Sequence, residues 1–223
     1  KPKKNIYNDK IKLSLVGCGG RGTGAVINAL NADDNIELIS MCDVFEDKIE
    51  SSLNNLKNEF KGTSKIQVKN ENCFTGFDGY KKTIDNADVV ILATPPGFRP
   101  QHFEYAVNSS KHVFVEKPVA TDISGIKRFI ESAKIVKKKK LNVVVGLQRR
   151  YQPSYINTFK QVKRGMVGKI TSGIVKWNSR GVWVKEREKN QSELEYQMRN
   201  WYYFNWLCGD HIVEQHIHNI DVA

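Results

Sequence analysis

The stretch that decides the fold is Ile11-Lys-Leu-Ser-Leu-Val16-Gly17-Cys18-Gly19-Gly20-Arg21-Gly22. Its first six residues are typical of a strand, and residues 20–30 have the pattern of a helix. The glycines therefore join a predicted strand to a predicted helix, the context in which G-x-G-x-x-G indicates a dinucleotide-binding turn. We predict a Rossmann-type α/β domain that begins at this stretch.

Each glycine of the turn has a predicted role. Gly17 permits the tight turn, Gly19 lets the backbone approach a pyrophosphate, and Gly22 allows the helix to pack closely on the strand. The N–H groups at the helix N-terminus favour the phosphates. A turn that binds no ligand is the other interpretation. The residues expected to contact the cofactor are Gly17, Cys18, Gly19, Gly20, Arg21 and Gly22.

Asp43 follows the second predicted strand and lies 21 residues after Gly22 (43 − 22). A carboxylate at this place can accept hydrogen bonds from both ribose hydroxyls and repels a 2′-phosphate. The next residues, Val44 and Phe45, provide no arginine that would hold such a phosphate. The sequence therefore favours NAD over NADP.

Strand and helix patterns alternate through the first 148 residues. Alternation of this kind predicts right-handed βαβ units on a parallel sheet, and strands rich in Val, Ile and Leu are typical of a sheet covered on both faces. We therefore expect a Rossmann domain over residues 1–148. The predicted strands are 11–16, 36–42, 66–68, 88–93, 112–116 and 141–147, and the predicted helices are 20–30, 45–60, 77–86, 100–109 and 122–139.

The pattern changes after Gln148. Residues 153–164 are predicted to be helical, residues 169–180 alternate like a strand, and a histidine-rich helix is expected at the end. We interpret residues 149–223 as the start of an α+β domain for substrate binding or oligomerisation. Because the sequence stops within an apparent helix, this region looks unfinished, and further sequence or a partner would be needed to cover its apolar surface.

The chain has 223 residues, of which 40% are hydrophobic, and an excess of 11 basic over acidic residues. The charge is partly local, at Lys1, Lys3 and Lys4 and in the run 137–140, which lies at a predicted helix end where lysines favour the helix dipole. No nucleic-acid-binding motif accompanies it, so we expect no nucleic-acid partner. The four cysteines form no CxxC pair, which favours free core thiols over a zinc or dithiol site.

No apolar run is long enough for a membrane span, so no membrane partner is expected. The sequence also shows no signal peptide. The cytoplasm is the default location. Because the chain starts at Lys1 without an initiator methionine, export to the periplasm remains open.

Two further motifs lie at ends of predicted strands. Ala93-Thr94-Pro95 ends one strand and Glu116-Lys117-Pro118 ends another, at the carboxyl edge where α/β proteins bind ligands. Pro118 favours extended geometry at Lys117, whose ammonium could then contact a substrate oxygen or transfer a proton. By itself Glu116-Lys117-Pro118 would be interpreted as a charged loop. Taken with the glycine turn, Ala93, Thr94, Pro95, Glu116 and Lys117 are added to the expected cofactor site.

Together with the glycine turn, these motifs resemble, in order and spacing, those of the Gfo/Idh/MocA family (glucose–fructose oxidoreductase and inositol dehydrogenase). The resemblance implies a Rossmann domain followed by a domain with an open, mostly antiparallel sheet, and a nicotinamide-dependent reaction at a sugar or cyclitol hydroxyl. It also implies that Lys117 is the catalytic or substrate-orienting lysine. A homodimer or homotetramer is expected by resemblance.

The family carries Asp-x-Gly-x-His-x-x-Asp in its second domain, and this chain has Glu214-Gln-His-Ile-His-Asn-Ile-Asp221. His218 and Asp221 match the motif, whereas Glu214 replaces its first Asp and leaves the substrate subgroup open. On a regular helix His211, Glu214, His218 and Asp221 would share one face. Glu214 is expected to orient a catalytic His218, with a solvated polar face as the alternative. The spacing matches no known zinc protease, so we expect no metal.

Aromatic residues are dense over 201–206. Their faces suit the apolar CH faces of sugars, although such clusters more often form a core or an interface. We predict substrate contacts from Trp201, Tyr202 and Asp221. Arg149 and Arg150 follow the last predicted strand. Arg149 is expected to contact substrate, and Arg150 is expected to form a structural ion pair.

The leading hypothesis is an NAD-dependent oxidoreductase that acts on a secondary alcohol of a sugar, cyclitol or other polyol. A second hypothesis is an NAD-dependent glycoside hydrolase that works by transient oxidation and elimination. A third is a sensor that binds NAD or a sugar without turnover.

Overall fold

The computed structural model describes residues 10–223, and the basic residues Lys1, Lys3 and Lys4 lie outside this range. A six-stranded sheet in the order β3-β2-β1-β4-β5-β6 forms its centre, and every strand pair is parallel. This is the order of a dinucleotide-binding Rossmann sheet, so the predicted α/β class is confirmed. The strands are β1 (Ile11–Val16), β2 (Ile36–Asp43), β3 (Cys73–Thr75), β4 (Val89–Leu92), β5 (His112–Val115) and β6 (Val143–Val145).

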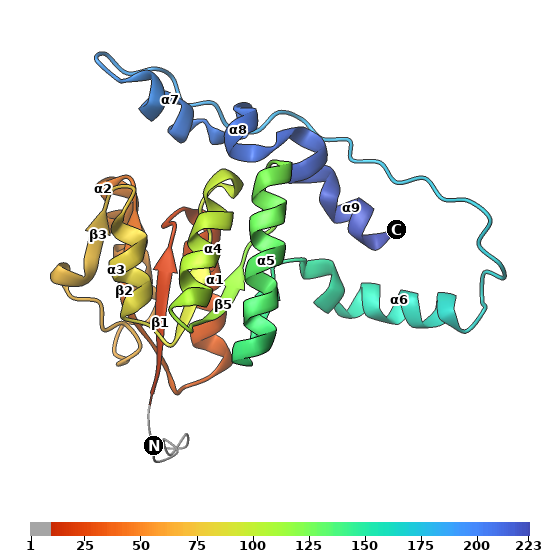
Figure 1. Cartoon of the computed structure of the whole chain (residues 1–223), viewed down its shortest axis with the longest axis horizontal. Coiled ribbons are helices and arrows are strands. Elements are labelled where there is room, and N and C mark those ends of the chain that lie inside the picture. The colour runs from red at the N-terminus through yellow and green to blue at the C-terminus, as the bar shows by residue number, and fades with distance from the viewer. Residues whose placement is uncertain (1–9) are drawn as a thin grey trace.

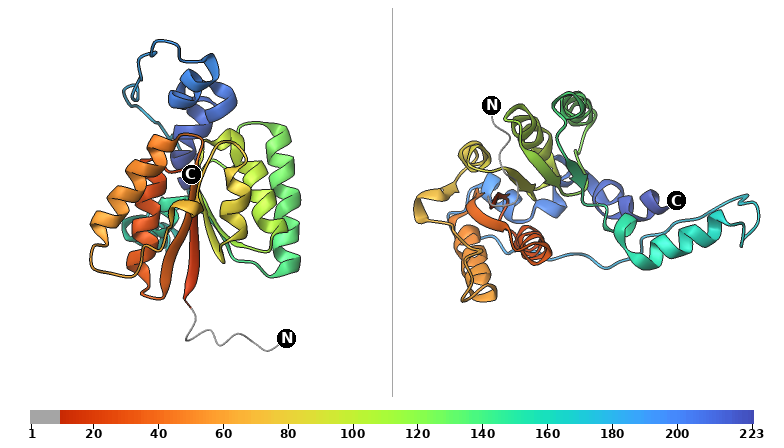
Figure 2. Two further views of the ribbon diagram at one scale, coloured as in Figure 1. Left: turned by 90° about the vertical axis from the view of Figure 1, so that its left-hand side faces the viewer. Right: turned by 90° about the horizontal axis from the view of Figure 1, so that it is seen from below.

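Helices cover both faces of the sheet, with α1 and α2 on one side and α3, α4 and α5 on the other (Figure 2). Alternate side chains along β1 serve the two layers: Leu13 and Leu15 pack under α1 and α2, and Val16 packs toward α3 and α4. The helices are α1 (Gly20–Ala32), α2 (Glu46–Glu59), α3 (Gly79–Asp85), α4 (Arg99–Asn108) and α5 (Ile123–Lys139).

The lysine run at the end of α5 has a structural use. The Lys139 ammonium donates to the carbonyls of Val107 (3.0 Å) and Asn108 (2.7 Å) at the C-terminal end of α4. These carbonyls lack partners within their own helix, and a cation satisfies them. Lys139 thus serves the end of α4, the helix beside its own, whereas the sequence pattern placed the run at the end of its own helix, α5.

The third strand lies later in the chain than predicted. Ile66 makes only an isolated bridge to Leu38, and the strand that pairs with β2 is Cys73–Thr75. A 3₁₀ turn at Asn70–Asn72 separates the two segments. Three residues give too little alternation for a pattern to reveal, and pairing with β2 decides where the strand forms.

Beyond β6 the chain first leaves the sheet and later returns over its end (Figure 1). A 3₁₀ turn (Gln148–Tyr151) leads into α6 (Pro153–Lys163), and a long irregular run joins α6 to α7 (Glu193–Arg199). Figure 1 shows α7 and α8 lying over the end of the sheet toward which the β1 arrow points, which is its carboxyl edge. The remaining elements are a 3₁₀ turn (Trp201–Tyr203), α8 (Asn205–Cys208), a π-helical turn (Ile212–His216) and α9 (Ile217–Val222).

The predicted strand at 169–180 is not present. No strand is assigned within residues 149–223, and the side chains of Ile170 and Ile174 are exposed. A strand requires a neighbour for its backbone hydrogen bonds, and no described segment of the sheet lies beside 169–180. The antiparallel sheet expected for the second region is therefore not seen, and its boundary at residues 148 and 149 stays a prediction.

The four cysteines are free, and Cys18, Cys42 and Cys208 are buried, as predicted for core thiols. No described helix combines the length and apolar character needed to cross a bilayer.

Candidate cofactor and active site

The glycine turn has the geometry that the sequence predicts. Gly17 has a φ of 98°, and a Cβ there would lie 2.7 Å from the backbone of Ala93 and Thr94. A Cβ at Gly22 would overlap the carbonyl oxygen of Gly17, whereas a Cβ at Gly19 would meet no atom within 4 Å. Gly17 and Gly22 are therefore required by packing, and Gly19 borders open space.

Asp43 ends β2 beside this turn. Its carboxylate accepts hydrogen bonds from the N–H groups of Cys18 (2.8 Å) and Phe45 (3.1 Å). Burial raises the pKa of Asp43, and these two N–H groups oppose that rise. Cys18 thus contributes its backbone to Asp43, while its thiol turns away and donates to the carbonyl of Cys42.

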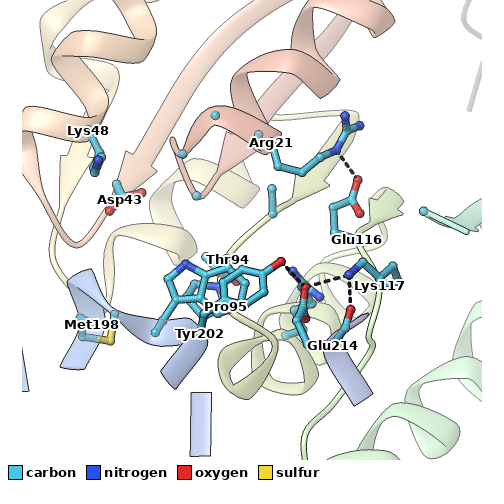
Figure 3. A pocket seen from close by; sticks show the side chains of 18 of the residues that line it. Arg21, Asp43, Lys48, Thr94, Pro95, Glu116, Lys117, Met198, Tyr202 and Glu214 are labelled. Atoms are coloured by element: carbon cyan, nitrogen blue, oxygen red, sulfur yellow. Dashed lines mark hydrogen bonds and ion pairs between the residues drawn. The ribbon is translucent and has the colours of Figure 1, made fainter. Parts of the chain in front are cut away.

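A single cleft of about 1540 Å³ runs from Asp43 to the residues after β5. This exceeds the roughly 300–1,000 Å³ of a pocket for a drug-sized ligand, so it has room for a dinucleotide and a second molecule. Figure 3 shows Asp43 and Lys48 at one end, and Lys117 and Glu214 at the other. The lining includes the predicted residues Gly17, Gly19, Gly20, Arg21, Gly22, Asp43, Ala93, Thr94, Pro95, Glu116 and Lys117.

Arg21 and Glu116, which both line the cleft, form an ion pair. Arg21 Nε donates to Glu116 Oε1 at 2.7 Å, and the Glu116 side chain is buried. A Cβ at Gly146 would lie 2.7 Å from Glu116 Oε2, so this glycine leaves the space that the carboxylate fills. The pair connects the glycine turn to the end of β5.

Lys117 lies beside Glu214, 97 residues later in the chain. Its ammonium donates to Glu214 Oε1 (2.7 Å) and to the Glu214 carbonyl (2.5 Å), and the Lys117–Pro118 peptide is cis. The Tyr202 hydroxyl also donates to Glu214 Oε1, at 3.1 Å (Figure 3). Glu214 is only 3% exposed. Burial raises its pKa, and the nearby charge of Lys117 lowers it.

His218 lines the same cleft from α9 and is buried. Burial, followed by repulsion from Lys117 and Arg149, lowers the pKa of His218 to about 4. The ring is therefore neutral at pH 7 and can accept a proton. The prediction that Glu214 orients His218 is wrong, because the Glu214 carboxylate makes its hydrogen bonds with Lys117 and Tyr202.

The predicted polar face of four residues is only partly formed. Residues 212–216 form a π-helical turn, whose wider spacing breaks the register expected of a regular helix. Glu214 and His218 face the cleft, whereas His211 is exposed and Asp221 is paired with Arg150 at 2.6 Å. Asp221 was expected to contact substrate, but it does not line the cleft. Arg150 is the arginine that forms the structural ion pair.

Trp201 and Tyr202 line the cleft, as predicted, with ring centroids 4.2 Å apart. Arg149 does not. It donates to the side chain of Asn219, and its guanidinium lies over the rings of Tyr155 (5.3 Å) and Trp177 (5.7 Å). These contacts turn it away from the cleft, so the expected substrate contact from Arg149 is not supported.

Arg99 is a lining residue that the sequence analysis missed. Its side chain is 4% exposed and donates to the Pro118 carbonyl at 2.6 Å, directly after Lys117. Burial lowers the pKa of Arg99 to about 10, and the charges of Glu214 and Glu116 oppose this shift. The signal for it was available, because Arg99 follows Thr94-Pro95-Pro96-Gly97-Phe98 at the carboxyl end of β4.

The sequence analysis also missed the wall above the Asp43 end. Residues far beyond the Rossmann sheet line it: Lys185, Glu186, Arg187, Glu188, Met198 and Arg199. No pattern marks them, because they reach the cleft only through the path of the chain. Among residues 10–223 no cluster of three His, Cys, Asp or Glu side chains has the arrangement to hold a metal ion.

The residues present fit a dinucleotide. Open space borders Gly19 and Gly20 at the N-terminus of α1, where a pyrophosphate would meet free N–H groups. The half-buried Asp43 carboxylate stands where a ribose would follow, and the cleft continues to Lys117.

Comparison with known proteins agrees with this geometry. Residues 11–147, which are more than half of the chain, match the model of an oxidoreductase family with an NAD-binding Rossmann fold. The chain belongs to the Gfo/Idh/MocA family. The resemblance predicted from the glycine turn and Glu116-Lys117-Pro118 is therefore confirmed.

Curated members of the family include enzymes of two kinds that resemble this chain. The inositol 2-dehydrogenase of Salmonella typhimurium strain LT2 is 26% identical over 162 residues, covering 71% of this chain and 43% of that enzyme. The glycosyl hydrolase family 109 protein of Streptomyces coelicolor is 24% identical over 165 residues, covering 73% of this chain and 33% of that protein. The chain thus matches less than half the length of either relative.

A solved structure of an inositol dehydrogenase is also similar to this chain. Scyllo-inositol dehydrogenase from Lactobacillus casei, with bound NAD(H) and scyllo-inositol, is 25% identical with a TM-score of 0.56. The match covers 73% of this chain and 44% of that one.

Proposed function

We propose that this protein is an NAD-dependent oxidoreductase that acts on a secondary alcohol of a sugar, cyclitol or related polyol. The observation that carries the proposal is the placement of Lys117 and Glu214, in contact at 2.7 Å, in the same cleft as the glycine turn and Asp43. The residues proposed to hold a dinucleotide and the Lys117–Glu214 pair thus line one cavity. Family membership and the inositol dehydrogenases among its relatives support this assignment.

The chain's own residues would hold NAD along the cleft. The N–H groups at the start of α1 bind the pyrophosphate, and Asp43 accepts hydrogen bonds from the adenosine ribose. The same carboxylate disfavours a 2′-phosphate, so NAD is proposed over NADP. When bound, NAD supplies the hydride acceptor or donor.

Three side chains are proposed to act at the substrate hydroxyl, each in a different role. Lys117 turns its ammonium to the substrate oxygen and stabilises the negative charge that develops there. His218, neutral at pH 7, accepts the proton. Glu214 holds Lys117 in place through its carboxylate and its carbonyl. The proposed role of Glu214 is therefore to position Lys117.

Trp201 and Tyr202 form an aromatic surface beside this pair. Aromatic rings pack well on the apolar CH faces of sugars and cyclitols, and the Tyr202 hydroxyl stays bound to Glu214. We propose that these two residues orient a polyol ring so that one hydroxyl meets Lys117.

A second candidate is glycoside cleavage, favoured by the match over 73% of the chain to a glycosyl hydrolase family 109 protein. Oxidation of one sugar carbon would acidify the neighbouring C–H, so that loss of this proton expels the glycosidic group by elimination. Water would then add to the resulting double bond and the hydride would return to the ketone carbon, so no reduced cofactor accumulates.

One assay separates these functions. The protein is incubated with NAD and a panel of cyclitols, sugars and aryl glycosides, while absorbance at 340 nm and aglycone release are followed together. NADH formation that falls by about 100- to 10,000-fold in Lys117→Ala supports the dehydrogenase. Aglycone release without NADH formation supports the glycosidase. A protein that binds NAD and gives neither signal is a sensor, and the proposal then fails.

By the family resemblance we also propose a homodimer or homotetramer. Exposed apolar side chains at Ile170, Ile174 and Val184 are consistent with an interface. A molecular mass in light scattering equal to one chain at every concentration would contradict this.

A further inference from the structure

The Asp43 end of the cleft has a second wall that does not come from the Rossmann sheet. Asp43, Val44 and Phe45 line it from the end of β2, and residues 185–188 with Met198 and Arg199 line the same cleft from beyond the sheet. Figure 3 shows Met198 at the same end as Asp43 and Lys48, far from Lys117 and Glu214. We call residues 183–200 the clasp.

The clasp is joined internally by a buried asparagine. Asn200 is 2% exposed, and its side chain accepts from the N–H of Lys185 (2.6 Å) and donates to the carbonyls of Lys185 (3.0 Å) and Tyr196 (3.1 Å). It therefore connects the irregular segment around Lys185 to α7. The two parts of the clasp are held as one piece over the cleft.

Arg199 attaches the clasp to the Rossmann domain. Its guanidinium donates to both carboxylate oxygens of Asp47 (3.1 and 3.2 Å) and lies 4.0 Å from the centre of the Phe45 ring. It also pairs with Glu195 on its own helix. Phe45 and Asp47 stand at the start of α2, two and four residues after Asp43. The attachment is thus next to the proposed ribose position.

These contacts are suited to opening and closing. Asp47 is more than half exposed, so solvent screens the ion pair and keeps it weak. The guanidinium over Phe45 adds a cation–π contact of modest strength. A cofactor can therefore enter when the pair opens and is covered when it forms.

We propose that the clasp supplies the second half of the adenosine subsite, with Arg199 as the residue that closes it and slows release of the cofactor. This inference rests on the proposed NAD assignment. The adenine lies between Phe45 and Val44 on one side and Met198 on the other, where a polarizable thioether suits an aromatic ring. The nicotinamide half lies toward Lys117, away from Met198 and Arg199.

The test compares ligands that contain adenosine with one that does not. Dissociation rates and affinities of NADH, ADP-ribose and reduced nicotinamide mononucleotide are measured by stopped-flow fluorescence and calorimetry on the full chain. Arg199→Ala is compared with Arg128→Ala. The control removes a solvent-exposed Arg–Glu pair between α4 and α5, outside the cleft. Asp47→Asn removes the ion pair alone and serves if Arg199→Ala does not fold.

We expect Arg199→Ala to release NADH and ADP-ribose about 5- to 30-fold faster, the combined effect of one ion pair and one cation–π contact. Asp47→Asn should have a smaller effect in the same direction, and Arg128→Ala none. The mononucleotide should bind all variants equally. If Arg199→Ala releases ADP-ribose at the wild-type rate, or if it speeds release of the mononucleotide by the same factor, the proposed role of the clasp is wrong. Because ADP-ribose undergoes no hydride transfer, its release tests the clasp even if the protein oxidises no substrate.

Discussion

Replacing Lys117 by methionine would leave the Glu214 carboxylate buried without its cation. The two groups meet at 2.7 Å, and their side chains are 11% and 4% exposed. Tyr202 would remain as the only side chain bonded to Glu214 among the described residues. Methionine keeps most of the volume of lysine, so the change removes charge rather than packing.

The expected loss follows from the distance and the burial. At an effective dielectric constant of about 20, two unit charges 2.7 Å apart attract by about 6 kcal/mol, and desolvation of both groups offsets part of this. Removal of one partner from a buried pair costs about 3–5 kcal/mol. We therefore expect Lys117→Met to lower the free energy of unfolding by this amount near pH 8.

The loss should depend on pH in a defined direction. Without Lys117 the pKa of Glu214 rises further above its unfolded value, so the folded state binds a proton that the unfolded state has released. Stability of the variant then falls as the pH rises through this interval, and the loss is smaller at pH 5 than at pH 8. Glu214→Gln in the same chain removes the buried charge and should restore most of the stability.

Urea unfolding of four proteins measures the coupling: wild type, Lys117→Met, Glu214→Gln and the double variant, each at pH 5 and pH 8. A coupling below about 0.5 kcal/mol would place the pair among solvent-screened ion pairs and refute the assignment of a buried one. A loss in Lys117→Met that is equal at both pH values would also contradict it.

Three further predictions concern the cofactor turn and acid stability. Gly22→Ala should lower the free energy of unfolding by about 1–3 kcal/mol, because the new methyl group meets the Gly17 carbonyl. Gly19→Ala should fold normally and should weaken NADH binding at least about tenfold, because its methyl group fills space that the pyrophosphate would occupy. Equal melting temperatures for the two variants would contradict this reasoning. Asp43→Asn should weaken NADH binding about 10- to 100-fold and reduce the preference of the protein for NADH over NADPH, as calorimetry with both cofactors would measure. Unchanged affinities for both cofactors would exclude a contact between Asp43 and the ribose. Burial lowers the pKa of His102 to about 3, below its unfolded value near 6.5. This group should therefore lower the free energy of unfolding by about 2 kcal/mol as the pH drops from 7 to 5, because the unfolded state takes up a proton that the folded state does not. In urea titrations the stability of His102→Gln should depend less steeply on pH than that of the wild type, and equal slopes would contradict this.

Local sequence determined the Rossmann domain and its glycine turn. Gly17 is required by its positive φ and Gly22 by its contact with the Gly17 carbonyl, both within one strand–turn–helix unit. The alternation of apolar strands with amphipathic helices specifies a parallel sheet covered on both faces. Asp43 could be assigned for the same reason, because it stands one residue after the predicted strand. Each of these features depends on neighbours a few residues away or on a regular repeat.

Only the tertiary structure decided which partners meet in the cleft. Glu214 lies 97 residues from Lys117 and Arg199 lies 152 residues from Asp47, and no periodicity relates residues so far apart. The π-helical turn at 212–216 also changed which side chains share a face, so Glu214 bonds to Lys117 rather than to His218. Sequence patterns report local geometry, whereas these contacts depend on how the chain after β6 returns over the carboxyl edge of the sheet.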